Sequence, residues 1–180
     1  LVSFYLTKTA FHNSVMKRAN SNMMLVEDMM GHLLFEKNII MPSVQVVKER
    51  RTGGIEQGGF VMENPIGVYQ NAFELDNSME YPSVIITTNG SPDTLVNPAD
   101  YPDGFPFPIT TTPAGRIYRR DREGIMPSVL RNLASLRKET QGLMREAYES
   151  GDDELGDTLN RKQRVQKESM NSWYGVLGSG

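Results

Sequence analysis

The sequence has no cysteine, only two histidines and no long apolar run. The lack of cysteine excludes disulfide bonds and thiolate metal sites, and His12 and His32 alone are too few for most histidine-based zinc sites. A membrane-spanning helix needs about 18 consecutive apolar residues, and no segment approaches that length, so no membrane partner is expected. The net charge of −3 over 180 residues argues against a protein that coats nucleic acid through basic charge along its whole length.

Charge is nevertheless distributed unevenly along the chain. Residues 116–170 hold 12 of the 19 lysines and arginines together with 10 acidic residues, so this stretch is slightly basic and the remainder is acidic. A ligand that carries phosphate groups is therefore best sought in the C-terminal third. Two solvated helices held together by salt bridges would produce the same distribution.

The pattern of apolar residues indicates both helix and strand. Spacings of three and four predict a helix over residues 14–37. Alternation of apolar and acidic residues predicts a strand over residues 68–76, and Pro82 suits the first turn of a short helix that follows it. Six prolines between residues 91 and 115 predict a loop there rather than a regular element.

The C-terminal part is predicted to form a helical hairpin. An apolar stripe predicts one helix over residues 127–150, and Ser150-Gly151 suits its end. Three acidic residues at 152–154 favour the start of a second helix that reaches about residue 173. The expected fold class is therefore α+β, with strands around residues 55–76 in part of an antiparallel sheet and a hairpin of two antiparallel helices after it.

The register of this hairpin brings cations together. If the helices fold back about Gly151, residue i faces about residue 302 − i, so Arg137 lies level with Arg164 and Lys167. Arg164, Lys167, Asn171 and Tyr174 are also spaced three, four and three apart, which places them on one helix face. Three converging cations favour a polyphosphate ligand. The alternative is a surface stripe whose long side chains extend into water.

A second segment with suitable chemistry runs from residue 74 to residue 86. Asp76 ends the predicted strand, and a carboxylate fixed at the end of a rigid element is well placed to hold a metal ion. The helix that follows offers free N–H groups that attract anions. The alternative for Asp76 is a simple helix cap.

These two segments resemble motifs A and B of the B-family (alpha-like) DNA polymerases. Asp76 with Tyr81-Pro82-Ser83 is similar to the family's D-x-x-x-x-Y-P-S motif, and residues 167–175 are similar to its K-x-x-x-N-S-x-Y-G motif. Gly58-Gly59, Ile125-Met126-Pro127 and Arg137-Lys138 also resemble family features in the same order. The resemblance implies a lead-in from an exonuclease region to the palm (1–52), a partial palm with motif A (53–115), a fingers hairpin with motif B (116–175) and the start of the return to the palm (176–180).

The resemblance implies a DNA-directed DNA polymerase that adds deoxynucleotides to a primer 3′ end by two-metal-ion phosphoryl transfer. Asp76 would bind both catalytic Mg²⁺ ions, helped by the Asn77 carbonyl, and Lys167 would be a candidate proton donor to the leaving pyrophosphate. Tyr81 would lie under the sugar and exclude a 2′-OH, while Tyr174 and Gly175 would line the nascent base pair. The backbone of Ser78, Met79 and Glu80 would contact the triphosphate, and Arg137, Lys167 and Asn171 would bind its tail. Arg164 is a candidate nucleotide contact from the register of the hairpin alone.

The implied partners are primer–template DNA, deoxynucleoside triphosphates and the remaining palm, thumb and exonuclease parts of the same polymerase. The implied location is intracellular, in the cytoplasm or nucleoid of a prokaryotic or virus-infected cell, with the nucleus as an open alternative. The chain begins without methionine and stops shortly after a helical segment, so we expect it to be an internal fragment.

The sequence also departs from the family pattern. Met79-Glu80 replaces the usual Ser-Leu, and we expect the Glu80 carboxylate to point away from the phosphates. Gln141 stands where a second lysine is common, and Glu56 stands where a tyrosine is common. Motif C, a Tyr-x-Asp-Thr-Asp type hairpin, does not occur in the 180 residues. Because one carboxylate holds two Mg²⁺ ions poorly, we expect the chain alone to be inactive.

Three functional readings therefore stay open at this point. The first is a palm-and-fingers fragment whose activity belongs to the whole polymerase. The second is a non-catalytic remnant that still binds nucleotide or nucleic acid. The third is one half of a split polymerase whose partner chain supplies motif C.

Overall fold

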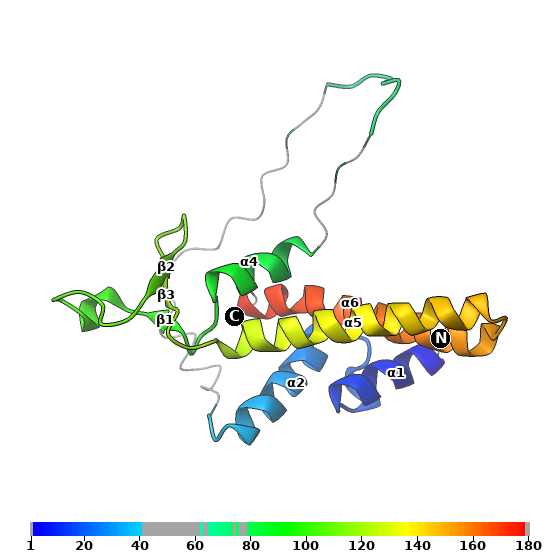
Figure 1. Cartoon of the computed structure of the whole chain (residues 1–180), viewed down its shortest axis with the longest axis horizontal. Helices are drawn as coiled ribbons and strands as arrows, with labels where there is room; N and C mark the ends of the chain where they lie inside the picture. The colour runs from blue at the N-terminus through cyan, green and yellow to red at the C-terminus, as the bar shows by residue number, and fades with distance from the viewer. Residues whose placement is uncertain (1, 41–61, 63–64, 74, 76–78, 179–180) are drawn as a thin grey trace.

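A computed structural model describes residues 2–40, 62, 65–73, 75 and 79–178 of the chain (Figure 1). The described residues form a mixed fold of α-helices and one small antiparallel sheet, which confirms the α+β class. The α-helices are α1 (Val2–His12), α2 (Asn22–Glu36), α4 (Glu80–Thr88), α5 (Ile125–Glu149) and α6 (Asp153–Gly178).

The predicted helical hairpin is confirmed by α5 and α6, which run side by side in opposite directions (Figure 1). Gly151 takes a left-handed φ of 80° between them, a conformation that favours glycine. Asp152 caps α6, since its Oδ1 accepts a hydrogen bond from the Leu155 N–H at 3.0 Å. Gln166 Nε2 donates to Thr140 Oγ1 across the hairpin at 3.1 Å, which is within about one helical turn of the predicted register.

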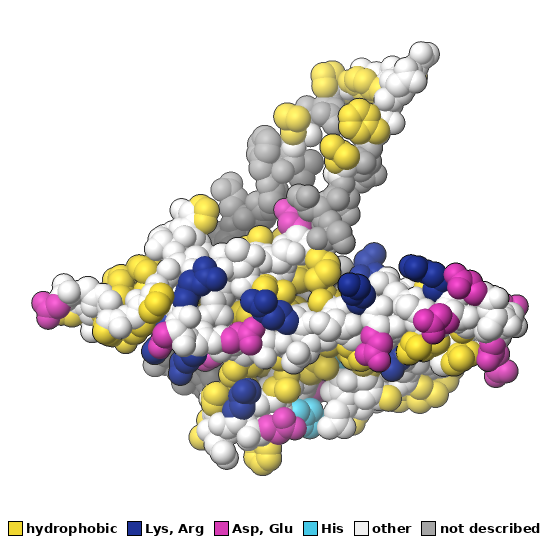
Figure 2. All heavy atoms as spheres, in the orientation of Figure 1, with side chains coloured by type: hydrophobic (Ala, Val, Ile, Leu, Met, Phe, Trp, Pro, Cys, Tyr) yellow, Lys and Arg dark blue, Asp and Glu magenta, His cyan; other side chains and the backbone are white. Residues whose placement is uncertain are grey.

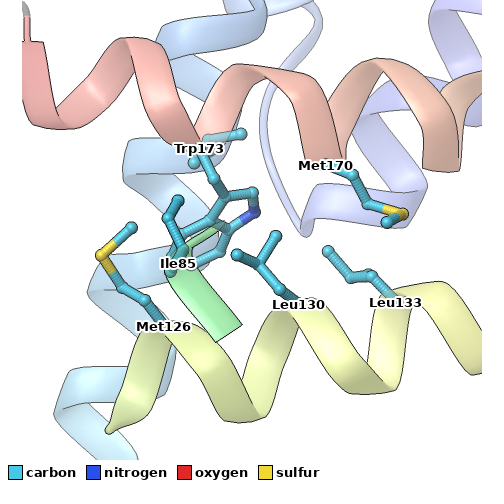
Figure 3. Close-up of a cluster of buried hydrophobic side chains, with 7 residues drawn as sticks. Ile85, Met126, Leu130, Leu133, Met170 and Trp173 are labelled. Atoms are coloured by element: carbon cyan, nitrogen blue, oxygen red, sulfur yellow. The ribbon is translucent and has the colours of Figure 1, made fainter. Parts of the chain in front are cut away.

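The hydrophobic core lies where four helices meet near the open end of this hairpin. Trp173 and Met170 of α6 pack with Leu130 and Leu133 of α5 (Figure 3). Ile85 adds a contribution from α4, and the remaining members of the cluster are Met126 of α5 and Val26 of α2. Pro82 is buried in the first turns of α4, as predicted, where a proline costs no helical hydrogen bond. Burial of these side chains fixes α4 against the long hairpin.

The sheet that the structure describes lies after the predicted strands around residues 55–76, of which residues 55–61, 63–64, 74 and 76 are outside the described part. Its strands are β1 (Leu95–Val96), β2 (Ile109–Thr111) and β3 (Ile117–Arg119), in the order β1-β3-β2, with Thr110 opposite Tyr118. The prediction of a loop throughout residues 91–115 was therefore wrong for β1 and β2. The prolines sit in the connections, where no ladder hydrogen bond is lost, while the β-branched run at 109–111 pairs with β3.

The predicted strand over residues 68–76 is not present in the part of it that the structure describes. Residues 65–73 and 75 have no regular structure, and the side chains of Val68, Phe73 and Leu75 are exposed. Alternation is a local signal, but a strand also needs a neighbour that binds its backbone N–H and C=O groups, and these described residues have none. The glycine pairs at 53–54 and 58–59, and Glu56, lie outside the described residues.

The N-terminal region also differs from the prediction. The helix expected over 14–37 begins only at Asn22, because Ser21 caps it by accepting a hydrogen bond from the Met24 N–H at 3.4 Å. Residues 16–18 form a separate short 3₁₀ turn. Helix α1 was not predicted, since its three buried residues are Lys8, Thr9 and His12, which do not produce an apolar stripe.

Among the helices that the structure describes, none combines the length and apolar composition required to cross a membrane.

Candidate functional site

The stripe predicted on α6 lies on the surface of the molecule. Arg164, Lys167, Asn171 and Tyr174 are all exposed, whereas Val165, Ser169, Met170 and Trp173 on the opposite side of this part of α6 are buried. Figure 2 shows Lys and Arg side chains spread along the visible face of the long helices, with acidic side chains between them. The stripe therefore presents two cations, an amide and a phenol to solvent within three helical turns.

Arg137 reaches this surface from α5. Its Nη2 lies 3.5 Å from Gln163 Oε1, and Gln163 precedes Lys167 by one helical turn on the same side of α6. Among the described residues, the buried Nε of Arg137 has no hydrogen-bond acceptor. An unpaired charged donor is costly, and because this nitrogen is buried, an added anion would have to bind the outer N–H groups of the guanidinium instead.

Arg164 has a different neighbour. Its guanidinium lies over the Phe4 ring of α1, 5.8 Å from the ring centroid. The described contacts therefore join Arg137 to the Lys167 side of α6, but they direct Arg164 toward α1. The three cations lie at one height along the hairpin, as the register predicts, without sharing a common contact.

Tyr81 and Tyr174 connect α4 with α6. Their rings stack with centroids 4.4 Å apart and an interplanar angle of 23°, and each side chain is 50% exposed. The chain enters α4 through Met79, which has a left-handed φ of 60°, and Glu80 lies in the first turn. The acidic side chain of Glu80 is favourable there, because it faces the positive end of the helix dipole. The stack places the start of α4 beside the C-terminal end of the α6 stripe.

A cleft of about 480 Å³ opens next to the tyrosine stack, between α4 and the sheet. Apolar side chains form most of its wall, so it suits a flat or apolar group better than a phosphate. Its lining residues include Glu80, Tyr81, Val84, Leu95, Tyr118 and Tyr174.

The remaining residues predicted to bind metal or nucleotide lie in a part of the chain outside the described residues. They are Asp76, Asn77 and Ser78, and their positions stay predictions. Within the described part of the chain, no group of three His, Cys, Asp or Glu side chains could hold a metal ion. Gly175 continues α6 directly after Tyr174 and is partly buried.

Asn89 is a residue whose structural importance sequence reasoning missed. It ends α4 in a left-handed conformation with a φ of 58° and is buried. Its Nδ2 donates to the carbonyls of Arg119 and Arg122 at 2.7 and 2.9 Å, and its Oδ1 accepts from the Gly124 N–H at 2.9 Å. One side chain thus joins the end of α4, strand β3 and the start of α5. An asparagine next to a glycine was the available sequence signal, but it indicates only a turn.

His12 is buried between α1 and α6. Its Nδ1 lies 2.8 Å from the Lys8 carbonyl, so Nδ1 carries the proton, and Nε2 accepts from Ser169 Oγ at 3.0 Å. Burial is the largest influence on this group, and it lowers the pKa of His12 below 6.5, with nearby Lys8 acting in the same direction. The Lys8 carbonyl, which accepts from Nδ1, and Asp28 on α2 act in the opposite direction.

This environment predicts a pH-dependent stability. The unfolded chain binds a proton at His12 more readily than the folded chain does, so the free energy of unfolding decreases as the pH falls through and below about 6.5. Urea denaturation between pH 8 and pH 5 measures this decrease. His12→Gln should reduce its slope, whereas the matched variant His32→Gln, at an exposed histidine, should retain it. Identical slopes for the parent and His12→Gln would contradict the assignment.

Comparison with known proteins identifies the family. The sequence profile described as DNA polymerase family B matches residues 12–180. DNA polymerase 1 of Pyrococcus abyssi is 34% identical over 158 residues, and the DNA polymerase of Thermococcus sp. (strain 9oN-7) is 32% identical over 156 residues. Each match covers 86% of this chain and 19% of the relative, so the chain spans about a fifth of the length of these relatives.

A solved structure agrees in fold. The family B DNA polymerase from the hyperthermophilic archaeon Pyrobaculum calidifontis superimposes with a TM-score of 0.68 and 21% identity, covering 99% of this chain and 23% of that one. The structural superposition and the profile match each cover nearly the whole chain. Both indicate the same family as the two motifs around residues 76 and 167. This chain therefore belongs to DNA polymerase family B.

Proposed function

We propose that these 180 residues form the part of a DNA-directed DNA polymerase that binds the incoming deoxynucleotide. The observation that supports the proposal is the contact of Arg137 Nη2 on α5 with Gln163 Oε1 on α6, one helical turn before the exposed Lys167. The relatives are DNA polymerases by name. In the whole protein, the reaction would add the nucleotide to a primer 3′ end paired with a template strand, inside a cell.

The described residues can bind and orient a nucleoside triphosphate. Lys167 and Arg137 would neutralise the triphosphate charge, and Asn171 would donate an amide N–H to a phosphate oxygen. The Lys167 ammonium would also be placed to give a proton to the leaving pyrophosphate. Arg164 would complete the cationic stripe at its far end, provided that it leaves the Phe4 ring.

The tyrosine stack would define the sugar and base part of the site. Tyr81 would lie under the sugar, where its ring leaves no room for a 2′-OH, and its stacking on Tyr174 holds the ring in place. Tyr174 and Gly175 would line the nascent base pair. The backbone of Ser78, Met79 and Glu80 would contact the triphosphate at the start of α4, where free helical N–H groups favour anions.

The proposed metal ligands fit magnesium by their chemistry. Asp76 and Asn77 offer a carboxylate and a carbonyl oxygen, and Mg²⁺ prefers oxygen ligands. Two bound ions would stabilise the attacking and leaving oxygens of the phosphoryl transfer. A second carboxylate from elsewhere in the polymerase would be required, because motif C does not occur in the 180 residues.

Nucleotide binding tests this proposal. We expect calorimetry to detect binding of a deoxynucleoside triphosphate with Mg²⁺ to the chain, and the double variant Lys167→Ala, Arg137→Ala to weaken it by at least about 100-fold. Each charged hydrogen bond contributes about 1.5–3 kcal/mol, so the loss of two of them accounts for this effect.

The matched control removes the same charge from other faces of the same helices. Lys138 on α5 and Lys162 on α6 are exposed, and neither belongs to the proposed site. The variant Lys138→Ala, Lys162→Ala should retain the affinity of the parent. Equal losses in the two double variants would show that net charge alone attracts the nucleotide, and no binding by a folded parent chain would contradict the proposal for this chain.

A further inference from the structure

A row of contacts joins α1 to the helix that carries the proposed nucleotide site. Three residues of α1, spaced four apart and therefore on one face, contact α6. The Arg164 guanidinium lies 5.8 Å from the centroid of the Phe4 ring, Lys8 Nζ lies 3.1 Å from Glu168 Oε2, and His12 Nε2 lies 3.0 Å from Ser169 Oγ. The residue numbers rise together on both helices, so α1 and α6 run in parallel along this contact.

Two of these contacts are buried and specific. Lys8 is only 5% exposed, and a buried ammonium is stable only with a partner, here the Glu168 carboxylate. His12 and Ser169 are also buried, and the hydrogen bond to the Lys8 carbonyl leaves Nε2 of His12 as an acceptor for the Ser169 hydroxyl. Rotation or sliding of α6 would break both contacts and leave buried polar groups without partners.

The position of these contacts along α6 links them to the proposed site. Glu168 and Ser169 directly follow Lys167, and successive helical residues point about 100° apart. When Glu168 and Ser169 face α1, Lys167 and Asn171 must face solvent on the side where Arg137 meets Gln163. The contacts with α1 therefore add to the core packing of α6 in favouring the rotation that exposes Lys167 and Asn171.

We propose that α1 positions the nucleotide-binding face of α6, with Lys8 and His12 as the positioning residues. They act through Glu168 and Ser169 and do not contact the nucleotide. This inference rests on the proposed function, because the orientation of Lys167 and Asn171 matters for binding only if that face holds the triphosphate.

The variant Lys8→Met tests the inference in the 180-residue chain. It retains the length of the side chain and removes the charge, so Glu168 loses its partner. We expect the affinity for a deoxynucleoside triphosphate with Mg²⁺ to fall by about fivefold or more, the range of a typical coupling between sites. Exchanging the charges in Lys8→Glu, Glu168→Lys should restore most of the affinity, whereas no rescue would contradict a role for the ion pair.

Two matched controls separate positioning from simple loss of stability. Lys17→Met removes one exposed lysine from the same N-terminal region and should leave the affinity unchanged. Val96→Ala creates a defect in the sheet, where Val96 is buried, and should lower the melting temperature without changing the affinity measured well below it. If Val96→Ala weakens binding as much as Lys8→Met at an equal loss of melting temperature, the positioning role is overturned.

Trp173 provides a readout that does not depend on nucleotide. It is the single tryptophan, is fully buried, and lies one helical turn after Ser169 on α6. We expect Lys8→Met to increase acrylamide quenching of its fluorescence while the far-ultraviolet circular dichroism stays unchanged. If the parent chain binds no nucleotide, the proposed function fails for this chain, and quenching alone then decides whether α1 sets the orientation of α6. If the parent chain binds nucleotide, unchanged quenching together with unchanged affinity in Lys8→Met overturns the inference. If the parent chain does not bind nucleotide, unchanged quenching alone overturns it.

Discussion

Replacing Trp173 with alanine is expected to lower the free energy of unfolding by about 3–5 kcal/mol, the range for truncation of a large aromatic residue in a core. Trp173 has no exposed surface and packs with side chains from α2, α4, α5 and α6 (Figure 3). Because these side chains come from four separate elements, they cannot close over the resulting cavity without moving whole helices. Among the described residues the buried indole N–H has no acceptor, so its removal offsets part of this loss, and the variant should fall within the range rather than at its upper end.

Urea denaturation followed by far-ultraviolet circular dichroism measures the loss, since the variant has no tryptophan fluorescence. Leu155→Ala on α6 is the matched control, because Leu155 is about half exposed and its truncation should cost less than about 1 kcal/mol. A loss below about 1 kcal/mol for Trp173→Ala would contradict the four-helix core.

Replacing Asn89 with alanine is expected to cost about 2–5 kcal/mol, because one buried and two partly buried backbone groups lose their partners. The carbonyls of Arg119 and Arg122 lose a donor, and the Gly124 N–H loses an acceptor. Alanine is also unfavourable at the left-handed φ of 58° by about 1–2 kcal/mol. The sheet and the start of α5 should then become less firmly held against α4.

Two further variants separate the causes. Asn89→Gly removes the side-chain hydrogen bonds but tolerates the left-handed conformation, so it should be more stable than Asn89→Ala. Asn89→Asp retains an acceptor for Gly124 and loses both donated hydrogen bonds, so it should also be less stable than the parent. Chemical denaturation of all three variants measures the order. A glycine variant as stable as the parent would show that the three hydrogen bonds contribute nothing.

The helical hairpin shows what could be predicted from sequence in this protein. The apolar stripe of α5, the glycine at 151 and the acidic residues that follow it are local signals, and helices form through local hydrogen bonds. The short turn at Gly151 alone sets which residues of the two helices face each other, and this register predicts that Arg137 lies level with Lys167. The motifs around Asp76 and Lys167 also indicated the family, because each is a short run of residues with the same spacing as the corresponding family motif.

The sheet and the N-terminal helix could not be predicted in the same way. A strand is stable only with its neighbours, and the pairing of residues 95–96 with 117–118 brings together positions that are distant in sequence. The alternation at 68–76 resembled a strand equally well, yet its described residues have no partner strand. Helix α1 buries Lys8 and His12, and polar residues are buried only where a specific partner exists elsewhere in the fold.

The sequence by itself therefore determined the family and the helical hairpin, and it predicts the residues that would bind the nucleotide. Only the tertiary structure decided how these residues are held: Tyr81 stacks on Tyr174, Asn89 joins three elements, and Lys8 of α1 pairs with Glu168 of α6. The physical reason is that motifs and helices depend on neighbours a few residues apart. The orientation of a side chain in a site depends instead on contacts between segments that are distant along the chain.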